Sequence, residues 1–289
     1  MTDLTKLQEL AAALPKELSE KALALVERMG ASIEGLGDEP QKWRPGNLKL
    51  IQGTSDRSKL PKGAIIGSLV LGDVIYDTPF NVIPMSVWSG RQMWSPDQNE
   101  AKLLCSSPDG KVGYMGYDCK TNCPHSKFDE VARKSECGAT YVVLAIAADM
   151  SDIFAITFAK TNYAIGKGWF KDMKDAGVAV YRRVYGLRSE TNKQYKQVES
   201  FVVEKYSGKD KETPAAVLPF IEELFKMIRD DRQEMLTSFH KMIIEKRASQ
   251  ANAPTLIESS ANDIIGEVTL IEAPTEVAGT SEMAAKYKV

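Results

Sequence analysis

Four cysteines close together in the middle of the chain are the residues most suited to specific chemistry. Cys105, Cys119, Cys123 and Cys137 follow the spacing C-x13-C-x3-C-x13-C, and the chain has no further cysteine. Four thiolates around one Zn²⁺ form a closed site that is structural rather than catalytic. Such a site would stabilise this segment, which is rich in glycine and proline and poor in apolar residues. His125 could replace one of the four thiolates.

Other interpretations of the cysteines stay open at this point. The segment lacks the paired C-x2-C motifs that are usual in zinc ribbons. The four residues could instead be unligated thiols, or take part in a disulfide or in catalysis. Because the N-terminal stretch lacks the apolar core of a secretory signal, we expect a cytoplasmic protein, in which disulfides are rare.

Signatures of catalysis are weak in this sequence. The chain has two histidines, His125 and His240, and no serine or cysteine has a histidine and a carboxylate at a recognisable spacing. Gly166-Lys167-Gly168 lacks the remainder of a phosphate-binding loop and is interpreted as a turn. Scattered aspartates are typical of solvated turns and helices rather than of a Mg²⁺ site, and this applies to Asp149, Asp152, Asp172 and Asp175. The sequence therefore predicts a protein that is not an enzyme.

A second group of residues combines aromatic rings with cations between residues 161 and 206. On an expected helix lie Tyr163, Lys167, Trp169, Phe170, Lys171 and Lys174. On an expected hairpin that turns at residues 190–192 lie Tyr181, Arg182, Arg183, Tyr185, Arg188, Lys193, Tyr195 and Lys196. A further cluster at the end of an earlier strand consists of Trp88, Arg91 and Trp94.

Single-stranded nucleic acid requires this combination of residues. Bases stack on aromatic rings at about 1–3 kcal/mol each, while lysine and arginine follow the phosphates. Strand alternation places Tyr181, Arg183 and Tyr185 on one face of the hairpin and Arg182 on the other. The competing interpretation is that the aromatic residues belong to the core and that the cations solvate an exposed face.

The elements that must position these residues indicate an α+β fold. Two short helices are expected within residues 1–42, followed by a β-rich core over 43–206 with a cysteine-bounded insert at 105–137. The core is expected to be a mostly antiparallel sheet or a barrel, OB-like or a variant of it, with one helix between residues 161 and 176. The expected strands are 48–52, 64–70, 74–76, 80–88, 141–148, 153–158, 178–187 and 195–206.

A long amphipathic helix is expected in the segment 207–247. Thr213-Pro214 is a suitable start, and an apolar stripe then continues from about Ala215 to Arg247. This stripe is expected to pack on the sheet, and a homo-oligomer contact is the alternative. Residues 248–289 are rich in Ala, Ser, Thr and Glu and are expected to form a flexible acidic tail.

The charge of the chain is distributed unevenly. The formal net charge of −2 by itself argues against a nucleic-acid partner. However, residues 43–206 carry 22 basic and 17 acidic side chains, whereas residues 1–42 have a net charge of −3 and residues 248–289 one of −4. The total therefore conceals a basic middle between acidic ends. The longest apolar run, 141–148, is too short to cross a bilayer, so no membrane partner is expected.

This organisation resembles bacteriophage single-stranded DNA-binding proteins. The resemblance is carried by the cysteine-bounded insert CSSPDGKVGYMGYDCKTNCPHSKFDEVARKSEC and the aromatic–basic sheet that follows it. It extends over residues 43–247 and is greatest to the Drc-type RNA polymerase cofactors of podophages that carry a virion RNA polymerase. It implies a protein of the host cytoplasm that binds single-stranded DNA without strong sequence preference and recruits phage RNA polymerase to melted middle promoters. It assigns no role to individual residues.

Two further functions remain as alternatives. One is a single-strand-binding role in replication or recombination, with replication proteins as partners. The other is a phage protein–protein interaction or structural component, in which the aromatic residues form the core and the long helix makes an oligomer.

Overall fold

A computed structural model of the chain describes residues 4–30, 45–53, 55, 58, 60–95, 103–127, 130, 135–192, 198–204 and 211–251. Three of the residues proposed above to contact nucleic acid lie outside this part, namely Lys193, Tyr195 and Lys196. Residues 31–44 and almost all of the expected acidic tail also lie outside it.

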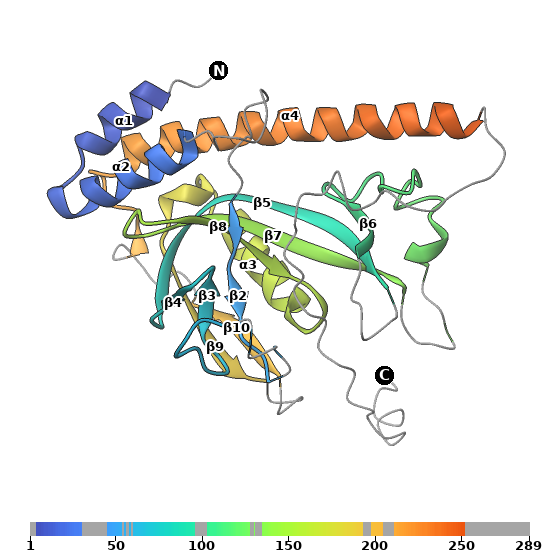
Figure 1. The fold of residues 1–289 in the computed structure, drawn as a ribbon, viewed down its shortest axis with the longest axis horizontal. Coiled ribbons are helices and arrows are strands. Elements are labelled where there is room, and N and C mark those ends of the chain that lie inside the picture. The colour runs from blue at the N-terminus through green and yellow to red at the C-terminus, as the bar shows by residue number, and fades with distance from the viewer. Residues whose placement is uncertain are drawn as a thin grey trace.

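Within the described residues, a curved seven-stranded sheet forms the centre of the molecule (Figure 1). Its strands follow the order β1 (Gly46–Asn47), β8 (Ile153–Phe158), β7 (Cys137–Ala147), β5 (Phe80–Trp94), β9 (Tyr185–Thr191) and β10 (Glu199–Val203), and β6 (Leu103–Ser107) also pairs with β5. All of these pairings are antiparallel except that of β1 with β8. A smaller sheet contains β2 (Lys49–Leu50), β3 (Leu69–Leu71) and β4 (Val74–Tyr76).

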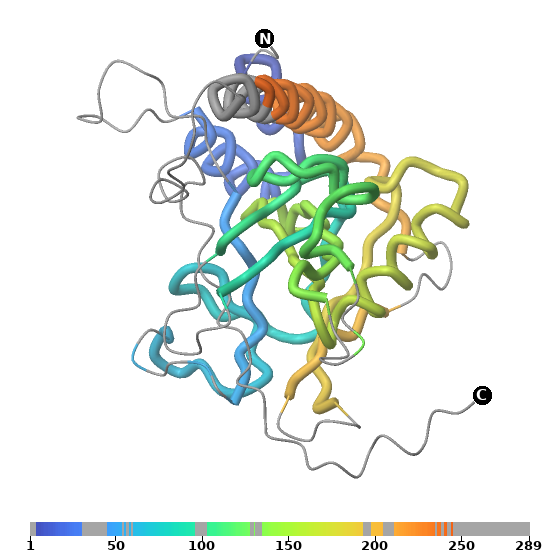
Figure 2. The backbone as a smooth tube through the Cα atoms, turned by 90° about the vertical axis from the view of Figure 1, so that its right-hand side faces the viewer, coloured from blue at the N-terminus to red at the C-terminus, as the bar shows by residue number. Residues whose placement is uncertain are grey.

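One face of the larger sheet is covered by three helices, α1 (Leu4–Ala12), α2 (Lys16–Gly30) and α4 (Leu218–Ala251). The buried residues of α2, Ala22, Leu25, Val26 and Met29, recur at the spacing of one helical face. Figure 2 shows α4 lying across the top of the molecule, with the strands beneath it.

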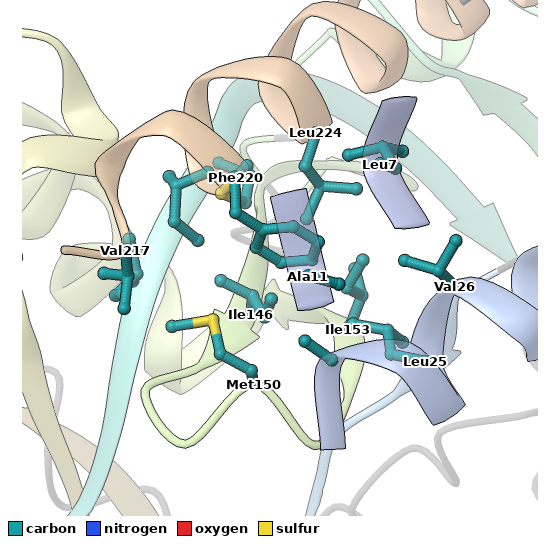
Figure 3. Packing of buried hydrophobic residues seen from close by; sticks show 14 of the residues in the cluster. Leu7, Ala11, Leu25, Val26, Ile146, Met150, Ile153, Val217, Phe220 and Leu224 are labelled. Carbon is teal, nitrogen blue, oxygen red and sulfur yellow. The ribbon is translucent and has the colours of Figure 1, made fainter. Parts of the chain in front are cut away.

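Apolar side chains of these helices and of the sheet form the first core cluster. Figure 3 shows Phe220 and Leu224 of α4 near Leu7 of α1 and Ile146 of β7. The N-terminal part of α4 therefore uses its apolar stripe to pack on the sheet, as the first of the two interpretations of this segment expects.

The opposite face of the sheet carries α3 (Tyr163–Asp175) and the second core cluster. Val143 of β7, Ile156 and Phe158 of β8, and Tyr185 of β9 are buried there against α3. The α+β class expected from the sequence is confirmed, with a curved, mixed sheet that has helices on both faces.

Two expected strands are partly wrong. Of residues 64–70, only Leu69 and Val70 belong to β3, because residues 65–68 form a turn in which the Ser68 N–H donates to the Ile65 carbonyl.

Residues 178–187 were expected to be extended, but Val180–Arg182 form a 3-10 turn and β9 begins at Tyr185. Strand alternation therefore does not apply to Tyr181 and Arg182, and the two faces assigned to this hairpin do not exist at its start. The backbone N–H of Arg182 instead donates to the carbonyl of Ala179, 2.9 Å away, which closes the turn.

Two glycines of α3 are expected to respond oppositely to alanine. A Cβ at Gly166 would lie 2.5 Å from Cβ of Phe158, whereas one at Gly168 would have no neighbour within 4 Å. Gly166→Ala must push α3 away from the sheet and is expected to lower the free energy of unfolding by about 1–3 kcal/mol. Gly168→Ala is expected to raise it by about 0.5–1 kcal/mol, because alanine restricts the unfolded chain. Urea unfolding followed by circular dichroism measures both, and equal stabilities would contradict the close packing of α3.

Candidate functional sites

Two of the aromatic residues expected to stack on bases are core residues. Trp169 of α3 is 3% exposed and Tyr185 of β9 is 1% exposed. Their ring centroids lie 5.3 Å apart in an edge-to-face arrangement, and Trp169 also meets Phe158 edge to face. No base can reach either ring in this structure, which corrects the interpretation of both residues as stacking platforms.

Two further aromatic residues face α4. Tyr181 packs against Phe225, with 4.9 Å between the ring centroids. Trp88 of β5 belongs to the edge of the first core cluster, and the Arg232 guanidinium lies 4.8 Å from its ring centroid. Both rings are half-buried and each is in contact with α4 on one side. That they bind nucleic acid stays a prediction.

Three of the cations expected to follow the phosphates have carboxylate partners. Lys171 pairs with Asp175 one helical turn away. Arg182 pairs with Glu222 at 3.1 Å, and Arg188 with Glu190 at 3.3 Å. Each carboxylate cancels the field of its cation, so these side chains form solvated ion pairs rather than a continuous basic surface.

The other expected contacts are dispersed over the sheet. Arg183 is half-buried just before β9, and Trp94 is half-buried at the end of β5. Arg91 of β5 lines the cavity that contains the cysteines. The structure therefore does not bring the aromatic and basic residues together as the sequence pattern indicated.

One face of α3 does combine exposed rings with cations. Tyr163, Lys167, Phe170 and Lys174 follow one another at intervals of four, three and four residues, so they lie along one side of the helix. Phe170 is 37% exposed, Tyr163 is half-buried, and both lysines are exposed. We call these four residues the α3 stripe.

Tyr141 of β7 lies beside the α3 stripe. Its ring centroid is 5.3 Å from that of Tyr163 and 5.6 Å from that of Phe170. Burial raises the pKa of Tyr141, and so does Tyr163, which shares a side-chain hydrogen bond with it, so the phenol remains neutral at physiological pH. The three rings thus form one aromatic surface bordered by lysines.

Sequence reasoning did not select Tyr141 as a site residue, although strand alternation contained the signal. Val143 and Ala145 of β7 belong to the second core cluster, on the α3 side of the sheet. Residue 141 is two positions before Val143 and therefore points to the same side. An aromatic residue at this position is therefore expected to contact the helix that covers this face of the sheet.

Tyr141 and Cys137 lie on the same face of the β5–β7 pair, four residues apart along β7. Tyr141 is opposite Ser89, and Cys137 is opposite Met93. Since Arg91 lies midway between these pairs on β5, strand alternation puts it on this face as well.

All four cysteines line one small cavity at the end of β5. Cys105 comes from β6, Cys137 from β7, and Cys119 and Cys123 from the loop between these strands. The cavity has a volume of about 10 Å³, which is room for about one water-sized atom. Three segments of the chain, at residues 105, 119–123 and 137, therefore bring their cysteines to one cavity.

A tight turn presents Cys119 and Cys123 on the same side. The Asp118 carboxylate accepts hydrogen bonds from the backbone N–H groups of Lys120 and Thr121, each at 2.9 Å. These bonds hold the pKa of Asp118 below its ordinary value. The N–H of Cys123 donates to the carbonyl of Asp118 at 3.0 Å, which closes the turn. The spacing C-x3-C thus suits this turn, although it differs from that of a zinc ribbon.

Burial favours the protonated form of two thiols in this cavity, those of Cys119 and Cys137, by raising their pKa. Burial raises the pKa of Cys137 to about 11, an effect that Arg91 opposes and the other three thiols reinforce. Burial also raises the pKa of Cys119, whereas a hydrogen bond with Ser107 lowers it. Within the described part of the chain, no three histidine, cysteine or acidic side chains are already arranged at the positions of metal ligands.

His125 lies at the rim of the same cavity. Its Nδ1 pairs with the Glu136 carboxylate, and its ring meets that of Tyr117 edge to face. The sequence interpretation of His125 as a substitute ligand thus agrees with its position, but the carboxylate engages one of its two nitrogens.

Comparisons with known proteins give no relative from which a function can be transferred. No protein-family model matches the chain, and neither a curated protein nor a solved structure matches it. Among the helices that the structure describes, none is long and apolar enough to cross a membrane. The function is therefore inferred from the α3 stripe and the cysteine cavity themselves.

Proposed function

We propose that the protein binds single-stranded DNA through Tyr141 and the α3 stripe. The observation that carries this proposal is the aromatic surface of Tyr141, Tyr163 and Phe170 with exposed lysines beside it. Lys167 lies between Tyr163 and Phe170 on the helix, and Lys174 follows Phe170 by one turn.

The chemistry of this surface favours a single strand over a duplex. An exposed phenyl or phenol ring offers a face on which a base of any type stacks, and the lysines neutralise the adjoining phosphates. In a duplex the base faces are already stacked on one another, and the grooves offer their edges instead.

The scaffold is compatible with this activity. OB-type proteins bind oligonucleotides on a curved, mostly antiparallel sheet, and a curved sheet lies beside the α3 stripe here. We infer an OB-like variant in which a helix packed on the sheet supplies part of the aromatic surface. Recruitment of a phage RNA polymerase, or of replication proteins, stays a prediction from the resemblance.

The test compares binding of the full chain to matched oligonucleotides. Fluorescence anisotropy with one labelled sequence, presented as a single strand and as a duplex, is measured at low and high salt. We expect tighter binding to the single strand, and an affinity that falls steeply as salt rises because phosphate contacts release counterions.

Equal binding to both forms, or no binding to either, would contradict the proposal. The second outcome would favour a protein–protein function, for which one surface is available. Around the smaller sheet, Ile65, Ile66, Val74 and Ile75 are exposed, with Ile65 at 71%. Exposed apolar side chains gathered in this way are typical of protein contacts.

A further inference from the structure

We propose that Cys105, Cys119, Cys123 and Cys137 bind one Zn²⁺ as four thiolates, and that this ion fixes the loop between β6 and β7 to the end of β5. The proposal is independent of DNA binding, because it rests on the cysteine cavity alone. Cys119, Cys123 and Cys137 are buried, and Cys105 is half-buried beside them.

The geometry of the cavity suits a single ion. Tetrahedral zinc holds its sulfur ligands at about 2.3 Å, which places the sulfur atoms about 3.8 Å from one another. The four thiols line this cavity but do not yet occupy ligand positions. Binding therefore requires each sulfur to turn about χ1, the one torsion that moves it.

Gly113 shows how closely the loop is packed on the thiols. A Cβ on this residue would lie 3.0 Å from Sγ of Cys105 and 3.6 Å from Sγ of Cys119. The side of Gly113 on which a Cβ would stand therefore faces two sulfurs from different segments at once. A side chain at this position would occupy the space through which Cys105 and Cys119 approach each other.

The ligand set and the cavity size together select zinc. Four soft sulfur ligands suit zinc or an iron–sulfur cluster. A cluster contains several iron and sulfide atoms, whereas this cavity accommodates about one atom. Four protein ligands also leave no open coordination position, so the ion is structural rather than catalytic.

Proton and charge balance agree with this assignment. Each of the four thiols loses its proton to solvent as it binds, so the ion with four thiolates has a net charge of −2. Arg91 lines the same cavity and interacts with Cys137 and Cys119, so its guanidinium offsets part of this charge. Offsetting this charge is the role that we assign to Arg91, which lies on the sheet face between Tyr141 and the cysteines.

The expected gain is local stability. Between residues 105 and 137 the chain has few apolar residues, and the described part of this loop contains one short 3-10 helix, Pro124–Ser126. Without an ion, β6, the first residue of β7 and the turn at Asp118 have to hold the thiols. Zinc binding adds bonds between β6, the loop and β7, and in small segments of this kind that energy is folding energy.

Metal analysis of the full chain tests the proposal. We expect the purified protein to contain one zinc ion per chain, and reconstitution of chelator-treated protein with Co²⁺ to give the thiolate-to-cobalt absorption of a tetrahedral site. Cys123→Ser is expected to lose more than about 10-fold in zinc affinity. Met93→Leu is the matched control, because Met93 lines the same cavity without being one of the proposed ligands, and it should retain the ion.

A measurement on the unmutated protein covers the case in which Cys123→Ser fails to fold. Titration with an organomercurial, read with a chromogenic zinc indicator, should release one zinc ion as the four thiols react. A protein with neither zinc nor a cobalt absorption band would overturn the proposal. So would His125→Ala losing zinc to the same extent as Cys123→Ser, since it would place an imidazole among the ligands.

Discussion

Replacing Trp169 with alanine is expected to lower the free energy of unfolding by about 3–5 kcal/mol while the neighbouring change Phe170→Ala has little effect on stability. Trp169 is 3% exposed, whereas Phe170 is 37% exposed. Loss of the indole leaves a cavity between α3 and the sheet, and the α3 backbone can close it only in part. Urea unfolding followed by far-ultraviolet circular dichroism measures both variants without relying on the fluorescence of the residue removed.

The environment of Trp169 explains the size of this effect. Its ring contacts Phe158 and Tyr185 edge to face, so its removal takes away one ring contact from each of two strands. Its buried Nε1 has no hydrogen-bond partner among the described residues, so Trp169→Phe loses packing volume but no hydrogen bond and is expected to cost less. Native stability of Trp169→Ala together with weakened DNA binding would contradict the structure and return this residue to the binding surface.

Sequence patterns predicted most of the elements because those patterns are local. Val74–Tyr76 and Ile153–Phe158 form strands with the expected bounds, and α3 lies inside the expected helical segment. β-Branched and aromatic residues between turn signals are sufficient to indicate such strands. By contrast, β6 was not expected, because Leu103–Ser107 has no β-branched or aromatic residue and only its pairing with β5 makes it a strand.

The candidate site was harder to predict, since burial depends on tertiary packing. Trp169 and Phe170 are neighbours in sequence, and composition gives no reason to prefer one as a stacking platform. The structure separates them because α3 turns Gly166, Trp169 and Met173 towards the sheet. A glycine three positions before the tryptophan was the available signal, because a helix can approach a sheet closely where it lacks a Cβ.

The cysteines represent the opposite case. Their clustering in sequence indicated a common role, and the fold brings all four to one cavity. The spacing of the cysteines could not show that a turn at Asp118 places Cys119 and Cys123 at the same cavity. It also could not show that Arg91 lines this cavity. Arg91 was assigned to nucleic acid from its two tryptophan neighbours, and strand pairing instead directs it to the thiols.

Removing the two rings of the α3 stripe is expected to have the largest effect on DNA binding. Tyr163→Leu and Phe170→Leu together retain apolar contact with Tyr141 but eliminate two aromatic faces. At about 1–3 kcal/mol for each stacked base, the double variant should bind a single strand at least about 10-fold more weakly. Anisotropy at one fixed salt concentration measures this loss, and circular dichroism checks that the variant is folded.

Charge and ring contributions are separable by their salt dependence. Lys167→Ala should reduce the slope of log affinity against log salt by about one phosphate contact, whereas the double leucine variant should leave that slope unchanged.

Lys171→Ala is the matched control for charge, since Lys171 is already paired with Asp175. Ile65→Ala is the control for loss of an exposed apolar side chain. A folded double variant that binds as tightly as the unmutated protein would refute the α3 stripe as the binding surface. Weaker binding by Ile65→Ala instead would place the contact at the smaller sheet, on an apolar surface that stacking and phosphate contacts do not explain.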